Sequence, residues 1–321
     1  MQSATDSRPL FSIVIPTRNE ERDIQPVLDR LLDLTYPNKE ILVVDDSTDR
    51  TPLIVSEYAD KGVSLICGSN RGRCAARNQG ILVAKGEFVI ILNGDVLLPQ
   101  DFLERVLAHY RQGAHYVLVE SEVANTENAY ARYIQALHRS AYQDADWIEW
   151  TEGFSCRKAC ALEAGLFPDL PFPRVSGEDG FFGMKLRAKG YRKVIDRSIV
   201  VQQIAPCHWK EFWNQRKERG QPFAKAFLDG YRSGRLLLWA LGRTALYLGQ
   251  VVLVVPVLCK GFRLSSYSPL GHSDFFRFSA LYMADRIAFV VAGWSGVSMI
   301  LTGKAGKLVK SRDAALGEPV R

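Results

Sequence analysis

The first 120 residues alternate short apolar runs with segments of helical periodicity, and this alternation limits the possible folds most strongly. Strands are expected at residues 11–15, 41–45, 63–67, 88–92 and 115–120. Between them, apolar residues recur at helical spacing, and proline, glycine or acidic residues stand at the junctions. Strands that alternate with helices through short connections are typical of a mostly parallel sheet with helices on both faces. We therefore predict an α/β domain.

Polar side chains follow three of these strands, in the segments 16–19, 45–49 and 93–95. Because the carboxyl ends of parallel strands meet at one edge of a sheet, we expect these segments to converge where such sheets bind ligands. Asp95 lies on a glycine turn directly after a buried strand, and oxygen ligands there suit a hard divalent cation that also holds phosphate. The same residues suit an ordinary turn with local hydrogen bonds. From the turn alone, both interpretations stay open.

Charge and hydropathy divide the chain near residue 207. Residues 1–207 carry a net charge of −4, whereas residues 208–321 carry +10 and the longest apolar runs. That combination favours an anionic membrane surface over nucleic acid as a partner. We find no nucleic-acid-binding motif.

The basic half predicts three successive regions. Residues 208–235 interleave aromatic and cationic side chains, as a helix lying in the membrane interface would. Residues 236–302 contain two apolar runs near spanning length, which predicts a two-helix membrane hairpin, spanning or re-entrant. A basic tail, residues 303–321, follows. For residues 208–235 the alternative is a helix that packs on the domain core, and for the hairpin it is a helical subdomain buried against a partner.

Cysteine usage and the N-terminal segment indicate the compartment. The six cysteines are scattered and form no CxxC pair, which fits a reducing environment. The first ten residues are polar and do not read as a signal peptide. Basic residues flank both ends of the predicted hairpin and place those ends in the cytoplasm. We expect a protein of the cell membrane whose catalytic domain is cytoplasmic.

Five ordered segments within residues 10–215 together resemble the inverting family 2 glycosyltransferases, which have the Rossmann-like GT-A fold. The segments read SIVIPTRNE, ILVVDDSTDRT, the block RGRCAARNQG to FLERVL, GFSCRKACALEAGLFP and GEDGFFGMKLRAKGY. The resemblance implies a GT-A catalytic domain over residues 1–207. It also implies an enzyme of polysaccharide assembly that moves a sugar from a UDP- or GDP-sugar to a saccharide or lipid-linked acceptor.

The resemblance also assigns donor-binding residues. Pro16 and Thr17 would line the base pocket, and Asp46 would accept a hydrogen bond from the nucleobase. Asp45 would shape the loop, and Arg77 would reach the base or the diphosphate.

The DxD motif of the family falls on residues 93–95 and departs from its usual form. Asn93 replaces the first aspartate, and an amide contributes less charge to cation binding than a carboxylate. Asn93 and Gly94 complete the donor-binding turn, and Asp95 would hold Mg²⁺ or Mn²⁺ on the diphosphate. His208 would provide a further metal or phosphate contact, unless it is only a surface histidine before a helix.

The segment GED supplies the catalytic carboxylates by the same resemblance. Asp179 would be the general base and Glu178 an orienting residue beside it, because inverting transfer needs a carboxylate to take the proton of the acceptor hydroxyl. Helix capping is the structural alternative for this pair. A non-catalytic nucleotide-sugar-binding or scaffold protein and a nucleotidyltransferase are the alternative functions. The QxxRW motif of processive relatives is missing, since Gln202 and Gln203 are followed by no Arg-Trp pair.

Overall fold

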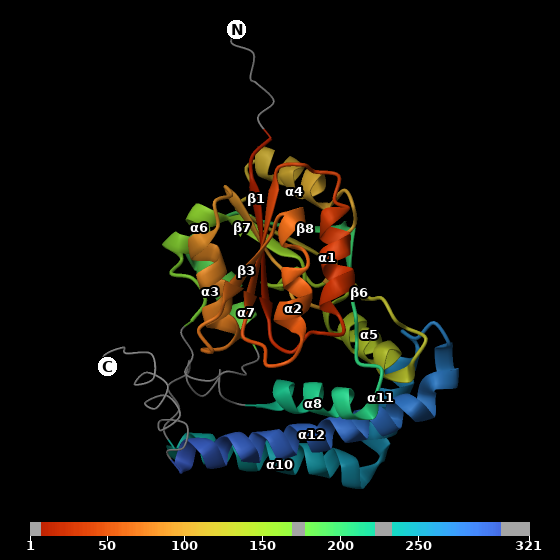
Figure 1. Ribbon diagram of the computed structural model, residues 1–321. Coiled ribbons are helices and arrows are strands. Elements are labelled where there is room, and N and C mark those ends of the chain that lie inside the picture. The colour runs from red at the N-terminus through yellow and green to blue at the C-terminus, as the bar shows by residue number, and fades with distance from the viewer. Residues whose placement is uncertain (1–7, 169–176, 222–232, 303–321) are drawn as a thin grey trace. The chain divides into compact units, whose positions relative to one another are not determined.

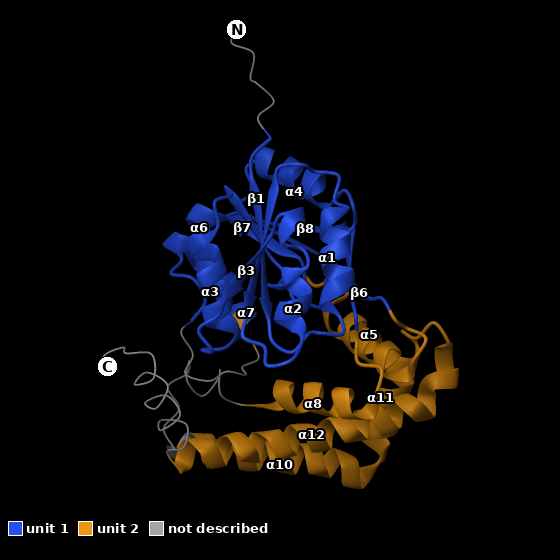
Figure 2. Cartoon of the chain, in the orientation of Figure 1, with its two compact units in different colours: residues 1–124, 146–169, 179–204 blue, residues 125–145, 170–178, 205–321 orange. Residues whose placement is uncertain are grey.

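The computed structural model describes residues 8–168, 177–221 and 233–302. The chain divides into two compact units (Figure 2). Unit 1 comprises residues 1–124, 146–169 and 179–204, and unit 2 comprises residues 125–145, 170–178 and 205–321. The four domain limits drawn from the sequence stay predictions. The tail 303–321 and most of the second half of the region 208–235 lie outside the described residues.

Unit 1 is built on one eight-stranded sheet with the strand order β3-β2-β1-β4-β7-β6-β8-β5. Strands β3, β2, β1 and β4 are mutually parallel, β6 is parallel to β8, and β7 and β5 pair antiparallel with their neighbours. The strands are β1 (Phe11–Thr17), β2 (Lys39–Asp45), β3 (Val63–Cys67), β4 (Phe88–Ile91), β5 (Val96–Leu97), β6 (Tyr116–Val123), β7 (Phe154–Arg157) and β8 (Lys193–Gln203). The mostly parallel sheet expected from the sequence is therefore confirmed.

Helices cover both faces of this sheet, with α1 and α2 on one side and α3 on the other (Figure 1). Helix α1 buries Ile24, Val27, Leu28 and Leu31, whose spacing of three and four residues forms one apolar stripe. The helices are α1 (Ile24–Leu32), α2 (Thr51–Ser56), α3 (Arg73–Val83), α4 (Phe102–Arg111), α6 (Lys158–Glu163) and α7 (Glu178–Ala188), with a short 3₁₀ turn, Ala59–Lys61.

The sequence predicts a helix from Glu178 and Asp179 to Gly190 with Phe181, Phe182, Met184 and Leu186 on its inner side, and α7 agrees only in part. Phe182 and Leu186 are buried as expected, but Met184, also assigned to the inner side, is 55% exposed. Positions 182 and 186 are four residues apart and share one face, whereas position 184 points about 200° around the helix from 182. The inner side of α7 is therefore narrower than the run of apolar residues suggested.

Unit 2 contains the helices α5 (Ala129–Tyr142), α8 (Trp209–Gly220), α10 (Ser233–Leu253), α11 (Val255–Ser265) and α12 (Phe275–Leu301), with a 3₁₀ turn at Gly271–Asp274. Helices α10 and α12 are long and apolar enough to cross a membrane by length and composition. The first apolar run of the sequence extends from Leu236 to Cys259, and the structure divides it between α10 and α11. It breaks at Val254, which has φ 58°, and α11 begins at Val255. Pro256 in its first turn has no amide hydrogen, so it cannot donate to a carbonyl of the preceding turn and continue α10. The expected hairpin therefore contains a third helix, α11.

One close contact in unit 1 leads to a stability prediction. A Cβ added at Gly80 of α3 would lie 2.2 Å from Cγ1 of the fully buried Val14 on β1. We expect Gly80→Ala to destabilise the chain by about 1–3 kcal/mol, because overpacking a stiff β-branched neighbour outweighs the better helix propensity of alanine. The shift of the melting temperature of the full chain measures this, at about 2–4 °C per kcal/mol.

Gly180 of α7 provides the matched control, since no atom lies within 4 Å of a Cβ added there. Gly180→Ala should leave the melting temperature unchanged or raise it slightly, because alanine has the better helix propensity and meets no neighbour there. Equal melting temperatures for the two variants would contradict the tight α3–β1 contact.

Candidate active site

The carboxyl ends of β1 and β2 form the first wall of the site. Their parallel register sets Pro16 beside Val44 and Thr17 beside Asp45. The Thr17 hydroxyl donates to Oδ1 of Asp45 over 2.7 Å, and the Ser47 hydroxyl donates to the same oxygen over 2.6 Å. Asp45 is therefore held inside the turn by neighbouring hydroxyls.

Asp46 is buried one residue further on. Its amide donates to the carbonyl of Thr17 over 3.0 Å, and its Oδ1 accepts from the amide of Asn70 over 2.7 Å. Burial raises the pKa of Asp46 above its ordinary value, although the Asn70 amide acts in the opposite direction. Pro16, Thr17, Asp45 and Asp46 thus meet at one edge of the sheet, with their side chains fixed by short-range contacts.

Arg77 and the turn after β4 form a second cluster. Arg77 on α3 is fully buried, with its guanidinium 5.1 Å from the ring of Trp150 and 5.0 Å from the ring of Phe167. Its Nη2 donates to Oδ1 of Asn93 over 3.1 Å, while Nδ2 of Asn93 donates to Oε2 of Glu152 over 2.8 Å. Asn93 therefore joins a cation to an anion, with its carbonyl toward Arg77 and its amide toward Glu152.

Asp95 lies on the other side of the same turn. Gln203 of β8 donates to its Oδ2 over 3.0 Å, and the amide of Ile204 donates to its backbone carbonyl over 2.8 Å. Its Oδ1 is buried without a hydrogen-bond partner. Burial raises the pKa of Asp95 above its ordinary value. A buried carboxylate oxygen with no donor is costly unless a ligand satisfies it.

Further acidic groups surround Asp95. Burial, and then the negative charges of Asp95 and Asp23, raise the pKa of Glu20 to about 8. Glu20 lies against the backbone of Gly94, since a Cβ added there would be 3.1 Å from its Cγ. Acidic oxygens forced together in this way fit a hard divalent cation. Among the described residues, however, no group of three or more His, Cys, Asp or Glu is arranged to hold a metal by itself. Such an ion would need oxygens from a phosphate or from water.

Helix α7 is fixed to the same part of unit 1 by its aromatic face. The ring of Phe182 stacks on Phe167 at 4.3 Å and meets Trp150 edge-on at 6.5 Å. Asp179 lies one turn earlier on this helix, half-buried, and its Oδ1 accepts from the amide of Gly180 over 2.8 Å. Phe167 and Trp150 are also the rings that cover Arg77, so α7 and the Asn93 turn share one aromatic support.

Two predicted residues belong to unit 2. Glu178 is buried, and His208 is exposed at the residue before α8, where its side chain caps no amide. The orienting role of Glu178 and the metal-binding role of His208 stay predictions, as do the binding roles of the unit 1 residues.

Sequence reasoning missed three polar residues in this region, Glu20, Glu152 and Gln203. Glu20 follows the first strand turn, and Glu152 precedes a glycine turn in Thr151-Glu152-Gly153. Both are therefore charged residues at strand-associated turns, which is the signal that could have identified them. Gln203 gives no such signal, because the pairing of β8 beside β5 that brings it to Asp95 is nonlocal.

Comparison with known proteins identifies the family. A family model described as Glycosyl transferase family 2 matches residues 12–170. A dolichyl N-acetyl-alpha-D-glucosaminyl phosphate 3-beta-D-2,3-diacetamido-2,3-dideoxy-beta-D-glucuronosyltransferase of Methanococcus voltae is 35% identical over 253 residues, which cover 71% of this chain and 76% of that protein. The chain belongs to glycosyltransferase family 2. It is a glycosyltransferase.

Other relatives of this glycosyltransferase match over shorter lengths. The UDP-Glc:alpha-D-GlcNAc-diphosphoundecaprenol beta-1,3-glucosyltransferase WfgD of Escherichia coli is 28% identical over 55% of this chain and 69% of that protein. The match to EpsH of Bacillus subtilis, 29% identical, covers 43% of this chain and spans about half of that relative, 46% of its length.

A solved structure supports the fold. The mannosyltransferase PcManGT of Pyrobaculum calidifontis, in complex with GDP-Man and Mn²⁺, aligns over 96% of this chain and 83% of its own, with a TM-score of 0.53 and 22% identity. Together with the sheet order, this likeness confirms the GT-A fold expected from the sequence.

The bonds of Asn93 lead to a prediction about its departure from the DxD pattern. Asn93→Asp would restore the usual motif but remove the amide that donates to Glu152, and would set two carboxyl groups at hydrogen-bond distance. We expect kcat/KM to fall about 10–100-fold. A polar group that loses its partner, or that faces a like charge, costs about 1–3 kcal/mol.

The double variant Asn93→Asp/Glu152→Gln is the control, because a glutamine amide can donate to the new carboxylate. It should recover most of the lost kcat/KM. Activity of Asn93→Asp equal to or above that of the natural chain would contradict the role given to this contact.

Proposed function

We propose that this glycosyltransferase inverts the anomeric centre and moves one sugar from a UDP- or GDP-sugar to a lipid-linked saccharide or a growing polysaccharide. The observation that supports this proposal is the position of Thr17, Asp46 and Asp95 at or after the carboxyl ends of the parallel strands β1, β2 and β4, with one oxygen of Asp95 buried and without a hydrogen-bond partner. Membership of glycosyltransferase family 2 supports the enzyme class.

We assign the nucleobase to the edge of the sheet at the carboxyl ends of β1 and β2. Asp46 would accept from a ring N–H through the oxygen not held by Asn70, and Pro16 and Thr17 would form the adjoining wall. Arg77 is covered by aromatic rings and donates to Asn93. It would therefore act on the diphosphate indirectly, by fixing the position of Asn93. Asp45 would keep the turn in place through its bonds to Thr17 and Ser47.

A divalent cation, Mg²⁺ or Mn²⁺, fits the acidic oxygens around Asp95. Asp95 would hold it through Oδ1, and Gln203 would orient that carboxylate through its bond to Oδ2. When bound, such an ion offsets the negative charge that develops on a leaving diphosphate. PcManGT, which has the same fold, was solved with GDP-Man and Mn²⁺.

Asp179 is the group we assign to proton transfer. The acceptor hydroxyl oxygen would form its bond to C1 of the sugar as the bond from C1 to the diphosphate oxygen breaks on the opposite face. The hydroxyl proton would pass to the Asp179 carboxylate, and the nucleoside diphosphate would leave. The amide of Gly180 holds Oδ1 of this carboxylate, which limits its rotation. Glu178, the preceding residue, would orient the Asp179 carboxylate.

Two relatives support a lipid-linked acceptor. The names of WfgD and of the Methanococcus voltae enzyme specify acceptors on diphosphoundecaprenol and on dolichyl phosphate. We propose a related polyprenyl-linked saccharide here, used at the cell membrane by a catalytic unit that faces the cytoplasm. The two apolar helices α10 and α12 are candidates for membrane association.

The general-base assignment is tested by Asp179→Asn. We expect kcat for sugar transfer to fall by about 10²–10⁴-fold, because the amide cannot take the proton, while the donor Kd stays within about twofold. Transfer to a lipid-linked acceptor and donor titration measure the two quantities.

Asp101→Asn is the matched control, since Asp101 also stands at the start of a helix and its side chain is 59% exposed. It should leave kcat unchanged. Near-normal turnover of Asp179→Asn would remove Asp179 from the mechanism. Inactivity of the natural chain towards every donor, despite tight binding, would favour the non-catalytic alternative.

The cation assignment is tested by Asp95→Ala. We expect the donor Kd in Mn²⁺ to rise about tenfold or more, and the difference between Mn²⁺ and EDTA to disappear, because the variant lacks the oxygen that holds the ion. Asp60→Ala, an exposed carboxylate of unit 1, should keep both the affinity and the EDTA response. Donor affinity that is the same for Asp95→Ala and the natural chain would exclude Asp95 as the ligand.

A further inference from the structure

The outer side of α10 is apolar from Leu236 to Leu253. Exposed leucine and valine side chains recur there, with Leu238 71%, Val252 77% and Leu253 67% exposed. Between Leu236 and Leu253 the one charged side chain is Arg243. Its guanidinium lies over the rings of Trp239, Tyr247 and Phe289 at 4.9, 5.2 and 5.6 Å.

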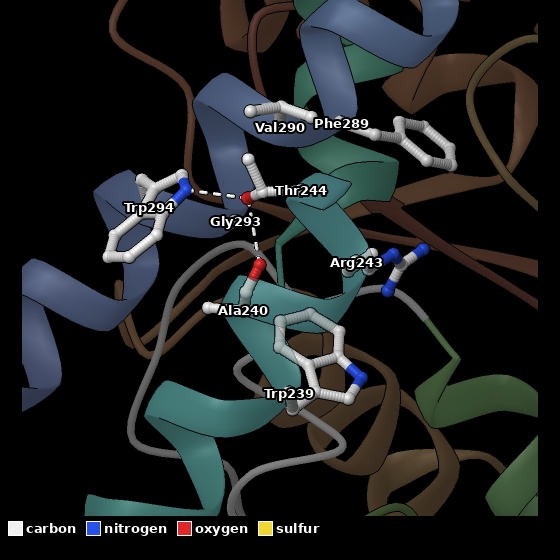
Figure 3. A pocket seen from close by; sticks show the side chains of 8 residues that line it. All are labelled: Trp239, Ala240, Arg243, Thr244, Phe289, Val290, Gly293 and Trp294. Carbon is white, nitrogen blue, oxygen red and sulfur yellow. Dashed lines mark hydrogen bonds between the residues drawn. The ribbon is translucent and has the colours of Figure 1, made fainter. Parts of the chain in front are cut away.

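A second apolar strip continues this face on α12. Helices α10 and α12 run antiparallel, because Thr244 accepts from Trp294 over 2.7 Å and Gln250 accepts from Tyr282 over 3.3 Å. The first of these bonds closes a small pocket between the two helices (Figure 3). On α12, Ile287 and Val291 are exposed one turn apart. Together, the outer faces of α10 and α12 form one surface, the apolar platform.

The other side of α12 is covered by polar helices. Asp285, near the middle of α12, is fully buried and accepts two hydrogen bonds from Arg216 of α8. Tyr133 of α5 donates to the same carboxylate over 3.3 Å. Gly220 of α8 also lies against α12, since a Cβ added there would be 2.8 Å from Cα of Phe289.

This cover is incompatible with a helix that crosses a bilayer. Helix α8 carries Lys210, Glu211, Lys217, Glu218 and Arg219 within its twelve residues. If α12 crossed the membrane, α8 would lie beside its central part and those charges would enter the hydrocarbon, which is strongly unfavourable. If the axis of α12 lies in the plane of the membrane, the apolar platform enters the lipid. Helix α8 then stays in water, which differs from the interfacial position that the sequence predicts for residues 208–235.

The turn before α12 is also bonded to a helix of the side that would stay in water. Asp274 is fully buried and accepts from Arg132 of α5 over 2.6 Å and from Ser268 over 2.7 Å. A turn tied to α5 in this way cannot be drawn through to the far side of a bilayer without breaking a buried ion pair.

We propose that unit 2 binds one leaflet of an anionic membrane through the apolar platform, with α10 and α12 lying in the membrane plane and crossing no bilayer. The +10 net charge of residues 208–321 is complementary to an anionic lipid surface. This inference deepens the membrane association in the proposed function, because it states how the chain is attached. The depth of burial would be about 5–10 Å, that of an interfacial helix.

A two-site labelling experiment decides between the two topologies. Cys67 of unit 1 and Ser273 in the turn before α12 are both exposed. The full chain with Cys207→Ser, Cys259→Ser and Ser273→Cys is reconstituted in vesicles of neutral and anionic phospholipid and treated outside with a membrane-impermeant maleimide. We expect each molecule to carry either two labels or none, by intact mass. A spanning hairpin puts the two sites on opposite sides and gives one label per molecule.

Detergent solubilisation is the internal control and should give two labels on every molecule. Mostly single labels in intact vesicles would overturn the in-plane topology. The unlabelled cysteine would then lie either across the bilayer or within its hydrocarbon, and both positions contradict the proposal. The outcome does not depend on sugar transfer, so a failed proposal for the chemistry and a failed topology are distinguishable.

Vesicle flotation tests the lipid as the occupant of the platform. Leu241→Glu/Leu248→Glu, at exposed positions of α10, should lower the partition coefficient about tenfold or more, whereas Leu53→Glu, at a 62% exposed leucine of unit 1, should not change it. Equal flotation of the two variants, or no preference for anionic vesicles, would assign the platform to a protein partner instead.

Discussion

The parallel pairing of β2, β1 and β4 is the constraint on which the active site depends. Parallel strands end at the same edge, so the residues after three separate apolar runs are forced into one neighbourhood. The bond from Thr17 to Asp45 and the bond from the Asp46 amide to Thr17 follow directly from this register. A one-residue slip would turn every one of these side chains to the opposite face of the sheet.

The turn after β4 combines satisfied and unsatisfied polar groups. Asn93 uses both ends of its amide, toward Arg77 and toward Glu152, and the aromatic rings of Trp150 and Phe167 cover the cation. Two residues later, Asp95 keeps a buried oxygen with no donor, and Glu20 is held nearby with a raised pKa. Both polar ends of the Asn93 side chain are therefore used in contacts within the protein, whereas Asp95 keeps one carboxylate oxygen that a ligand could bind. This difference between positions 93 and 95 follows from the asparagine that replaces the usual first aspartate, because only an amide can donate to Glu152.

In unit 2, two buried arginine–aspartate pairs decide which side of α12 faces the other helices. Arg132 of α5 pairs with Asp274 in the turn that leads into α12, and Arg216 of α8 pairs with Asp285 within α12. Removing one partner from such a pair leaves an uncompensated buried charge, which is strongly destabilising. The pairs thus fix the rotation of α12, and with it the side that remains apolar and exposed.

The sequence alone determined the strand–helix alternation, the mostly parallel sheet and the strand-end segments that contain Thr17, Asp46 and Asp95. These follow from local periodicity and from the geometry of parallel sheets, which need no knowledge of distant contacts. Tertiary structure decided the rest. Glu152 lies 59 residues from Asn93 and Gln203 lies 108 residues from Asp95 in the chain, so no local pattern reveals these contacts. The same holds for α12, whose apolar composition is that of a spanning helix. Only the tertiary structure reveals that the charged helix α8 packs against its middle, and charged groups cannot be buried in hydrocarbon without partners.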